Sequence, residues 1–185
     1  MVAAPGPSPA PLNANPGEFK EVGQAGVPAM HAGLLPNGRV VFLDKVEDYT
    51  QVKLPNGQFA YSAEYDPGTN TYVPLSYKTN AFCSGGAFLA DGRFVSLGGN
   101  APLDFLDPTV TDGFTGIRYL ERPNGDGSKD GQSWTEPGNK LASARWYASA
   151  QTMPNGEIFV ASGSLNGLDP LVLTNNNPTY EVLDR

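Results

Sequence analysis

The sequence predicts an all-β protein, and three observations support this fold class. First, its 185 residues include 22 glycines and 17 prolines, a composition typical of a chain with many turns. Second, no long segment has the apolar periodicity of an amphipathic helix. Third, short alternating apolar segments follow Asn-Gly or Asp-Gly pairs, as in β-hairpins. A chain of this length is expected to form one domain with a sizeable core.

Three segments of the chain share one pattern, which indicates a repeat. Each has small and apolar residues, then an Asn-Gly or Asp-Gly pair, then an alternating strand: MHAGLLPNGRVVFLD from Met30, CSGGAFLADGRFVSLGG from Cys83 and YASAQTMPNGEIFVASG from Tyr147. Each pair predicts a type I′ hairpin turn. The turn glycines Gly38, Gly92 and Gly156 are 54 and 64 residues apart. This spacing is near the period of roughly 50 residues of kelch-type propeller blades.

The remainder of each period supplies the third and fourth strands. FAYSAEYDPGTNTYVPL contains two strand-like runs around an Asp-Pro-Gly turn, and GIRYLERPNGDGSKDGQSWTEP repeats this plan with a longer loop. Tyr72 and Trp134 then fall in fourth strands. The chain ends 29 residues after Gly156, where the third blade would turn into its fourth strand. We therefore expect a partial kelch-like β-propeller of about two and three-quarter four-stranded blades, a fragment of a larger propeller.

Composition also restricts the domain plan and the partners. Residues 1–18 are rich in proline and alanine and predict a flexible leader, without the features of a signal peptide, and residues 19–185 form the propeller part. The net charge of -7 and the absence of a basic stripe argue against a nucleic-acid partner. No run reaches the roughly 18 apolar residues of a membrane span, so no membrane partner is expected. The single cysteine excludes an intrachain disulfide framework.

Cys83 and Tyr147 hold equivalent positions in two of the repeats. Cys83 lies nine residues before Gly92, and Tyr147 lies nine residues before Gly156. Equal offsets predict equivalent places in successive blades, so the thiol and the phenol are expected to approach one another. The alternative remains open that Cys83 is a small buried core residue and Tyr147 a structural tyrosine, because free cysteines are among the most buried residue types.

The motifs around this pair resemble those of a known enzyme family. NAFCSGG, RWY and NPTYE, in this order and at suitable spacing, resemble the copper radical oxidases of the glyoxal oxidase type, which are relatives of galactose oxidase. AMHAGLLPNGRVVFLD resembles the start of their propeller. The resemblance covers nearly everything after residue 18.

The resemblance implies a specific chemistry. It implies a thioether between Cys83 and the ring of Tyr147, with Tyr147 as both radical and copper ligand. It also implies oxidation of a small aldehyde by dioxygen to a carboxylic acid and hydrogen peroxide, in a family that is usually secreted. An anionic phenolate suits Cu(II) in a tetragonal site.

The chain departs from the family pattern in its ligands. The family site also uses a second tyrosine and two histidines, whereas the 185 residues contain one histidine, His31, which matches neither ligand motif. We interpret His31 as a structural or surface residue. Arg145 and Trp146 are candidates for the rim of the site, with packing as the alternative for Trp146. We expect the chain to hold only the Cys83–Tyr147 half of the site, without stably bound copper or activity alone.

Two other hypotheses belong to different classes. One is a kelch-type binding module without catalysis, and the other is a truncated product without an independent function. For the oxidase half-site, the expected partners are a small aldehyde substrate in the intact family and the missing remainder of the propeller.

Overall fold

The computed structural model describes residues 17–47, 51–123, 127–169 and 171–184. Within these ranges ten strands and one short 3-10 turn, Leu173–Asn175, are the regular elements, and none of them is an α-helix. No helix among these residues is therefore long and apolar enough to cross a membrane. The predicted leader, residues 1–18, lies outside the described residues except for its last two positions.

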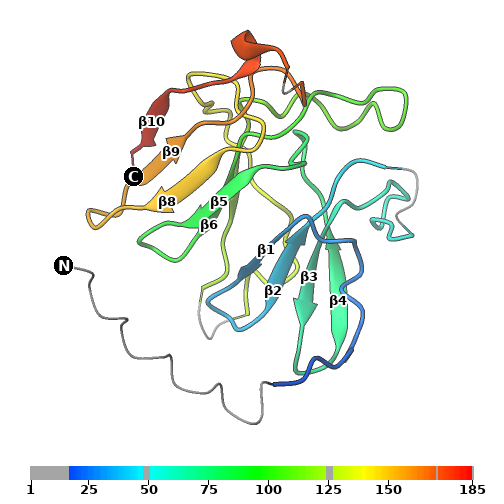
Figure 1. The fold of residues 1–185 in the computed structure, drawn as a ribbon. Coiled ribbons are helices and arrows are strands. Elements are labelled where there is room, and N and C mark those ends of the chain that lie inside the picture. The colour runs from blue at the N-terminus through cyan, green and yellow to red at the C-terminus, as the bar shows by residue number, and fades with distance from the viewer. Residues whose placement is uncertain (1–16, 48–50, 124–126, 170, 185) are drawn as a thin grey trace, which may run out of the picture.

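The strands form three antiparallel sheets, which lie side by side in chain order (Figure 1). The first sheet contains β1 (His31–Leu34), β2 (Val40–Leu43), β3 (Ser62–Asp66) and β4 (Thr71–Leu75). The second contains β5 (Gly85–Phe88), β6 (Phe94–Leu97) and β7 (Ile117–Leu120). The third contains β8 (Ser149–Thr152), β9 (Ile158–Ala161) and β10 (Tyr180–Leu183). Each sheet pairs its strands in sequence order, which is the topology of a propeller blade, and the predicted all-β class is confirmed.

The fourth strand differs between the blades. Tyr72 lies in β4, as predicted. In the second blade the fourth strand is reduced to a single bridge between Tyr119 and Thr135. The neighbouring Trp134 donates its backbone N–H to Ser76 O at 3.1 Å and its indole N–H to Ser62 Oγ at 2.9 Å, both in the first blade. Trp134 therefore ties two blades together instead of extending the sheet beside β7.

The three hairpins form where predicted, but their turns are not of type I′. The N–H groups of Gly38, Gly92 and Gly156 each donate at 2.9 Å to the carbonyl three residues earlier, with φ of 82°, 85° and 85°. The preceding Asn or Asp keeps a negative φ, whereas type I′ needs positive φ at both central residues. These are three-residue loops with glycine in the left-handed position. The side-chain oxygen of Asn37, for example, accepts the Arg39 N–H at 3.1 Å, which explains the preference for Asn or Asp.

The hydrophobic core lies between the blades. One cluster joins the first and second sheets and includes Leu43, Leu75, Phe94, Leu120 and Trp134. A second cluster joins the second and third sheets and includes Leu97, Ile117, Ile158 and Val160. Consequently β5 and β8, which begin their blades, pack against one another. The residues just before these two strands are thereby brought together.

Candidate active site

Cys83 and Tyr147 each lie in a turn two residues before the first strand of a blade. Both have a left-handed backbone, with φ of 56° for Cys83 and 62° for Tyr147. Four described residues other than glycine have positive φ, and these two are among them. The left-handed region is sterically unfavourable for residues with a side chain and occurs frequently at functional sites. The equal sequence offsets therefore correspond to the same local conformation in adjacent blades.

The two turns are in direct contact. The backbone N–H of Tyr147 donates to the carbonyl oxygen of Cys83 at 2.9 Å. The side chains also meet: a hydrogen bond with Cys83 raises the pKa of the Tyr147 phenol. Burial raises the pKa of the Cys83 thiol, and its contacts with Tyr147 and Trp146 act in the opposite direction. The thiol and the phenol are therefore neighbours in space.

The exposure of the two side chains is unequal. Cys83 is buried, with 8% of its surface exposed, whereas Tyr147 is 55% exposed. The cysteine therefore lies inside the protein, whereas part of the neighbouring tyrosine remains accessible to solvent.

Trp146 packs against both members of the pair. Its ring centroid lies 4.5 Å from that of Tyr147 and 6.1 Å from that of Phe82, the residue before Cys83. The indole is only 5% exposed, and its backbone exchanges hydrogen bonds with Ser164 at 2.9 and 2.7 Å. Trp146 therefore forms the buried wall of the site.

Two buried arginines hold the two turns in place. Arg118, from β7, lies beneath the Cys83 segment, donating to Thr79 O at 2.9 Å, Asn80 O at 3.2 Å and Gly98 O at 2.8 Å. Burial lowers the pKa of Arg118 to about 10, so it remains a cation at neutral pH. The side chain of Asn80 in turn accepts the Phe82 N–H at 3.1 Å. The base of the cysteine turn is thereby fixed.

Arg145 has the corresponding role below Tyr147. It donates to Glu181 Oε1 at 2.7 Å, to Ser162 O at 2.9 Å and to Thr179 O at 3.0 Å. It is 1% exposed, so the expectation that it shapes the rim of the site is wrong: the side chain points into the blade. The hydrogen bond to Glu181 brings the RWY and NPTYE motifs together in space.

Two adjacent glycines allow the neighbouring blades to approach the cysteine turn. A Cβ atom on Gly85 would lie 2.6 Å from Ala148 O in the third blade. A Cβ atom on Gly86 would lie 2.3 Å from Cε1 of His31 in the first blade. Successive residues of a strand face opposite sides of the sheet, so each glycine serves one neighbour. The paired glycines of CSGG are thus explained by packing on both faces of β5.

His31 belongs to this packing. Its ring lies against Gly86 and meets Phe94 edge-on, with 5.6 Å between ring centroids. Burial lowers the pKa of His31, and its Nδ1 has no hydrogen-bond partner among the described residues. His31 therefore contributes to the contact between the first and second blades.

The residues present do not complete a metal site. The described part of the chain contains no group of three or more His, Cys, Asp or Glu side chains that could hold a metal ion. The donors at the pair are one phenol and one buried thiol. A tetragonal copper site needs more ligands than these. The described residues by themselves therefore do not fit a complete copper centre.

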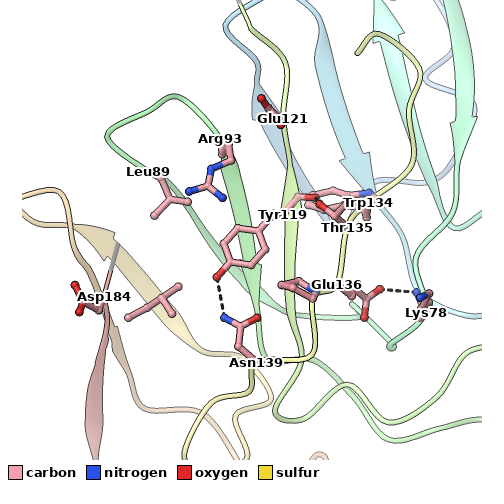
Figure 2. A pocket seen from close by; sticks show the side chains of 12 residues that line it. Lys78, Leu89, Arg93, Tyr119, Glu121, Trp134, Thr135, Glu136, Asn139 and Asp184 are labelled. Atoms are coloured by element: carbon pink, nitrogen blue, oxygen red, sulfur yellow. Dashed lines mark hydrogen bonds between the residues drawn. The ribbon is translucent and has the colours of Figure 1, made fainter. Parts of the chain in front are cut away.

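A separate groove of about 680 Å³ lies beside the second blade and the end of β10 (Figure 2). Within it, Asn139 Nδ2 donates to the Tyr119 hydroxyl at 2.9 Å, and the Arg93 guanidinium lies 5.3 Å from the Tyr119 ring centroid. The residues that line the groove do not include Cys83 or Tyr147, both of which the structure describes. The groove and the Cys83–Tyr147 pair are therefore different features of the surface.

Sequence reasoning missed the supporting residues Asn80, Arg118 and Glu181. Arg118 carried a signal, since a charged residue inside the apolar strand GIRYL must face solvent or a set of buried acceptors. Its partners are carbonyl groups from distant loops, which a pattern of residue types does not reveal.

Comparison with known proteins places the chain in a family. The family model described as "Glyoxal oxidase N-terminus" matches residues 30–168. Aldehyde oxidase GLOX of Vitis pseudoreticulata is 30% identical over 158 residues, covering 77% of this chain and 28% of that protein. Aldehyde oxidase GLOX1 of Arabidopsis thaliana is 29% identical over 160 residues, covering 75% of this chain and 23% of that protein. The chain thus spans about a quarter of the length of these relatives.

A solved structure shows a similar fold. A fungal alcohol oxidase of the AA5 family, in complex with copper, superposes with a TM-score of 0.62 at 22% identity, covering 92% of this chain and 31% of that one. This likeness confirms the predicted partial propeller. Together with the match over residues 30–168, it establishes the relationship that NAFCSGG and RWY suggested: the chain belongs to the glyoxal oxidase N-terminal family.

Proposed function

We propose that the chain supplies the Cys83–Tyr147 half of a copper radical oxidase site, in a protein that oxidises small aldehydes with dioxygen to carboxylic acids and hydrogen peroxide. The observation that carries this proposal is the contact between the two turns, with Tyr147 N–H on Cys83 O at 2.9 Å and the side chains in contact. The substrate class follows the relatives named aldehyde oxidase.

Each residue of the pair has a distinct part in this proposal. Cys83 Sγ forms a thioether to the carbon beside the phenol oxygen of Tyr147. One C–S bond forms, the S–H and ring C–H bonds break, and two electrons and two protons pass to dioxygen as hydrogen peroxide. The sulfur then donates electron density to the ring. The exposed phenol oxygen of Tyr147 is the ligand that this chain would offer to copper.

The remaining copper ligands must come from residues outside the described site. One histidine cannot provide two imidazoles, and the contacts of His31 are with Gly86 and Phe94. We therefore propose that the remainder of a propeller is the partner that completes the centre. Apart from the single equivalent of hydrogen peroxide that accompanies cross-linking, the chain alone is expected to release none when methylglyoxal is added. Peroxide release by the chain alone that continues in proportion to the methylglyoxal supplied would contradict this part of the proposal.

Mass spectrometry tests the half-site directly. The purified chain is exposed to copper in air, and its intact mass is compared with that of an untreated sample. We expect the loss of two hydrogens, mapped to a linked pair of peptides that contain Cys83 and Tyr147. Tyr147→Phe is the matched control, since it retains the ring without the phenol that is oxidised. A thiol that still labels completely with maleimide after treatment would overturn the half-site.

The groove in Figure 2 favours a second candidate, a non-catalytic kelch-type binding module. It combines an aromatic ring, Tyr119, with the charged groups of Arg93 and Glu121 at a place away from the pair. The same mass measurement separates the two functions. Complete maleimide labelling of Cys83 would favour the binding module, and a linked peptide pair would favour the oxidase half-site.

A further inference from the structure

The Trp146 indole N–H is a buried donor without a conventional acceptor. Among the described residues, its Nε1 atom is one of three buried side-chain nitrogen or oxygen atoms that make no hydrogen bond. The side chain is only 5% exposed, so water does not readily satisfy the donor. Buried polar groups are nearly always paired, and an exception calls for an explanation.

The Trp146 side chain lies beside the Cys83 thiol, where it counteracts the rise that burial causes in the pKa of that thiol. A neutral thiol is a weak acceptor, which is consistent with the absence of a normal hydrogen bond. The indole cannot readily turn away, because its ring lies 4.5 Å from that of Tyr147 and its backbone is bonded in both directions to Ser164. The indole is therefore held beside the cysteine turn by a rigid frame.

We propose that Trp146 is a positioning residue: its indole N–H holds the Cys83 sulfur against the ring of Tyr147. The inference deepens the proposed function and rests on it for its chemical consequence. The thioether requires one sulfur to meet one ring carbon, and a thiol can otherwise rotate among three staggered positions. A single N–H contact favours the rotamer that faces the phenol.

The chain offers a matched pair of variants for the test. Trp146→Phe retains an aromatic ring beside Tyr147 but removes the N–H. Trp134→Phe removes the other indole N–H of the chain, which donates to Ser62 Oγ of the first blade at 2.9 Å. Both variants remove one buried donor, so a general loss of stability affects both.

Nuclear magnetic resonance provides a readout that does not depend on copper. The chain has two tryptophans, so a sample labelled with nitrogen-15 gives two indole N–H signals, and Trp134→Phe assigns them. We expect Cys83→Ala to shift the Trp146 signal and to leave the Trp134 signal in place. A Trp146 signal that stays unchanged in Cys83→Ala would overturn the contact, whatever the mass experiment gives.

The cross-linking reaction provides the second readout. With copper in air, we expect Trp146→Phe to form the Cys83–Tyr147 thioether in severalfold lower yield per folded molecule than the wild type. We expect the yield per folded molecule of Trp134→Phe to equal that of the wild type. Equal yields for Trp146→Phe and the wild type would overturn the positioning role. If the indole signal shifts but the wild type forms no thioether, the proposed function fails and the N–H contact with the sulfur stands.

Discussion

The backbone N–H of Tyr147 donates to the carbonyl oxygen of Cys83 at 2.9 Å, and both residues occupy the left-handed region. Two neighbouring blades are thus joined at the two residues that carry the expected chemistry. The buried arginines Arg118 and Arg145 hold the two turns from below.

The left-handed conformation of Cys83 should be measurable as strain. At φ of 56° a side chain is unfavourable, whereas glycine adopts this backbone freely. We therefore expect Cys83→Gly to unfold with a free energy about 1 kcal/mol higher than Cys83→Ala. Urea unfolding measures the difference. The same two substitutions at Ser84, which lacks a positive φ, are the control and should give the reverse order.

The glycine pair at the start of β5 predicts unequal costs. Gly85→Ala would press against the backbone carbonyl of Ala148, which cannot move without shifting β8, and should cost about 2–3 kcal/mol in unfolding free energy. Gly86→Ala meets the His31 and Phe94 side chains and should cost less. His31→Ala should recover part of the loss in Gly86→Ala and none of the loss in Gly85→Ala. If His31→Ala restored the unfolding free energy of Gly85→Ala, the assignment of each glycine to one neighbouring blade would be contradicted.

Arg145 should be essential for the stability of the third blade. Its removal would leave Glu181 and the carbonyl groups of Ser162 and Thr179 without their buried donor, so we expect Arg145→Met to lower the unfolding free energy by about 3 kcal/mol. Arg145→Lys should recover little, because an ammonium group cannot reproduce the planar set of donors. Thermal unfolding of both variants tests this, with Arg93→Lys, at a partly exposed arginine, as the control. Full recovery by lysine would indicate that charge alone matters.

Asp44 should make stability fall as pH rises. It is fully buried, its Oδ2 has no hydrogen-bond partner among the described residues, and burial raises its pKa to about 6, above the ordinary 3.8. The native state therefore retains the proton that the unfolded state loses. Between about pH 4 and pH 6 the wild type should lose up to about 3 kcal/mol relative to Asp44→Asn.

Asp91 provides the control of opposite sign. Despite some burial, its bonds with Arg93 lower its pKa, so its stabilising contribution is lost as pH falls. Urea unfolding at several pH values separates the opposite contributions of Asp44 and Asp91 to stability. The free energy of unfolding is compared between the wild type and a variant of each of the two residues. An Asp44→Asn profile parallel to that of the wild type would show that Asp44 does not titrate in this range.

The repeat could be predicted from the sequence because its evidence is local. Gly38, Gly92 and Gly156 mark three turns by residue type, and the equal offsets of Cys83 and Tyr147 place both in equivalent turns. The turn type was wrong, because Asn37 and its equivalents act through their side chains and not through positive φ. The buried role of Arg145 was also missed, since its partners Ser162 and Thr179 are loop carbonyls that residue types do not identify.

The CSGG motif meets two independent requirements: the cysteine serves the chemistry, and the glycines serve the packing of the blades. Gly85 and Gly86 are needed because two blades approach one strand from opposite faces, and this need persists whether or not the thiol reacts. A related protein that had abandoned oxidation would retain the glycines for as long as it retained the blades. Searches for active members of the family should therefore give weight to the cysteine and the tyrosine in the paired turns, and treat the glycines as a signature of architecture.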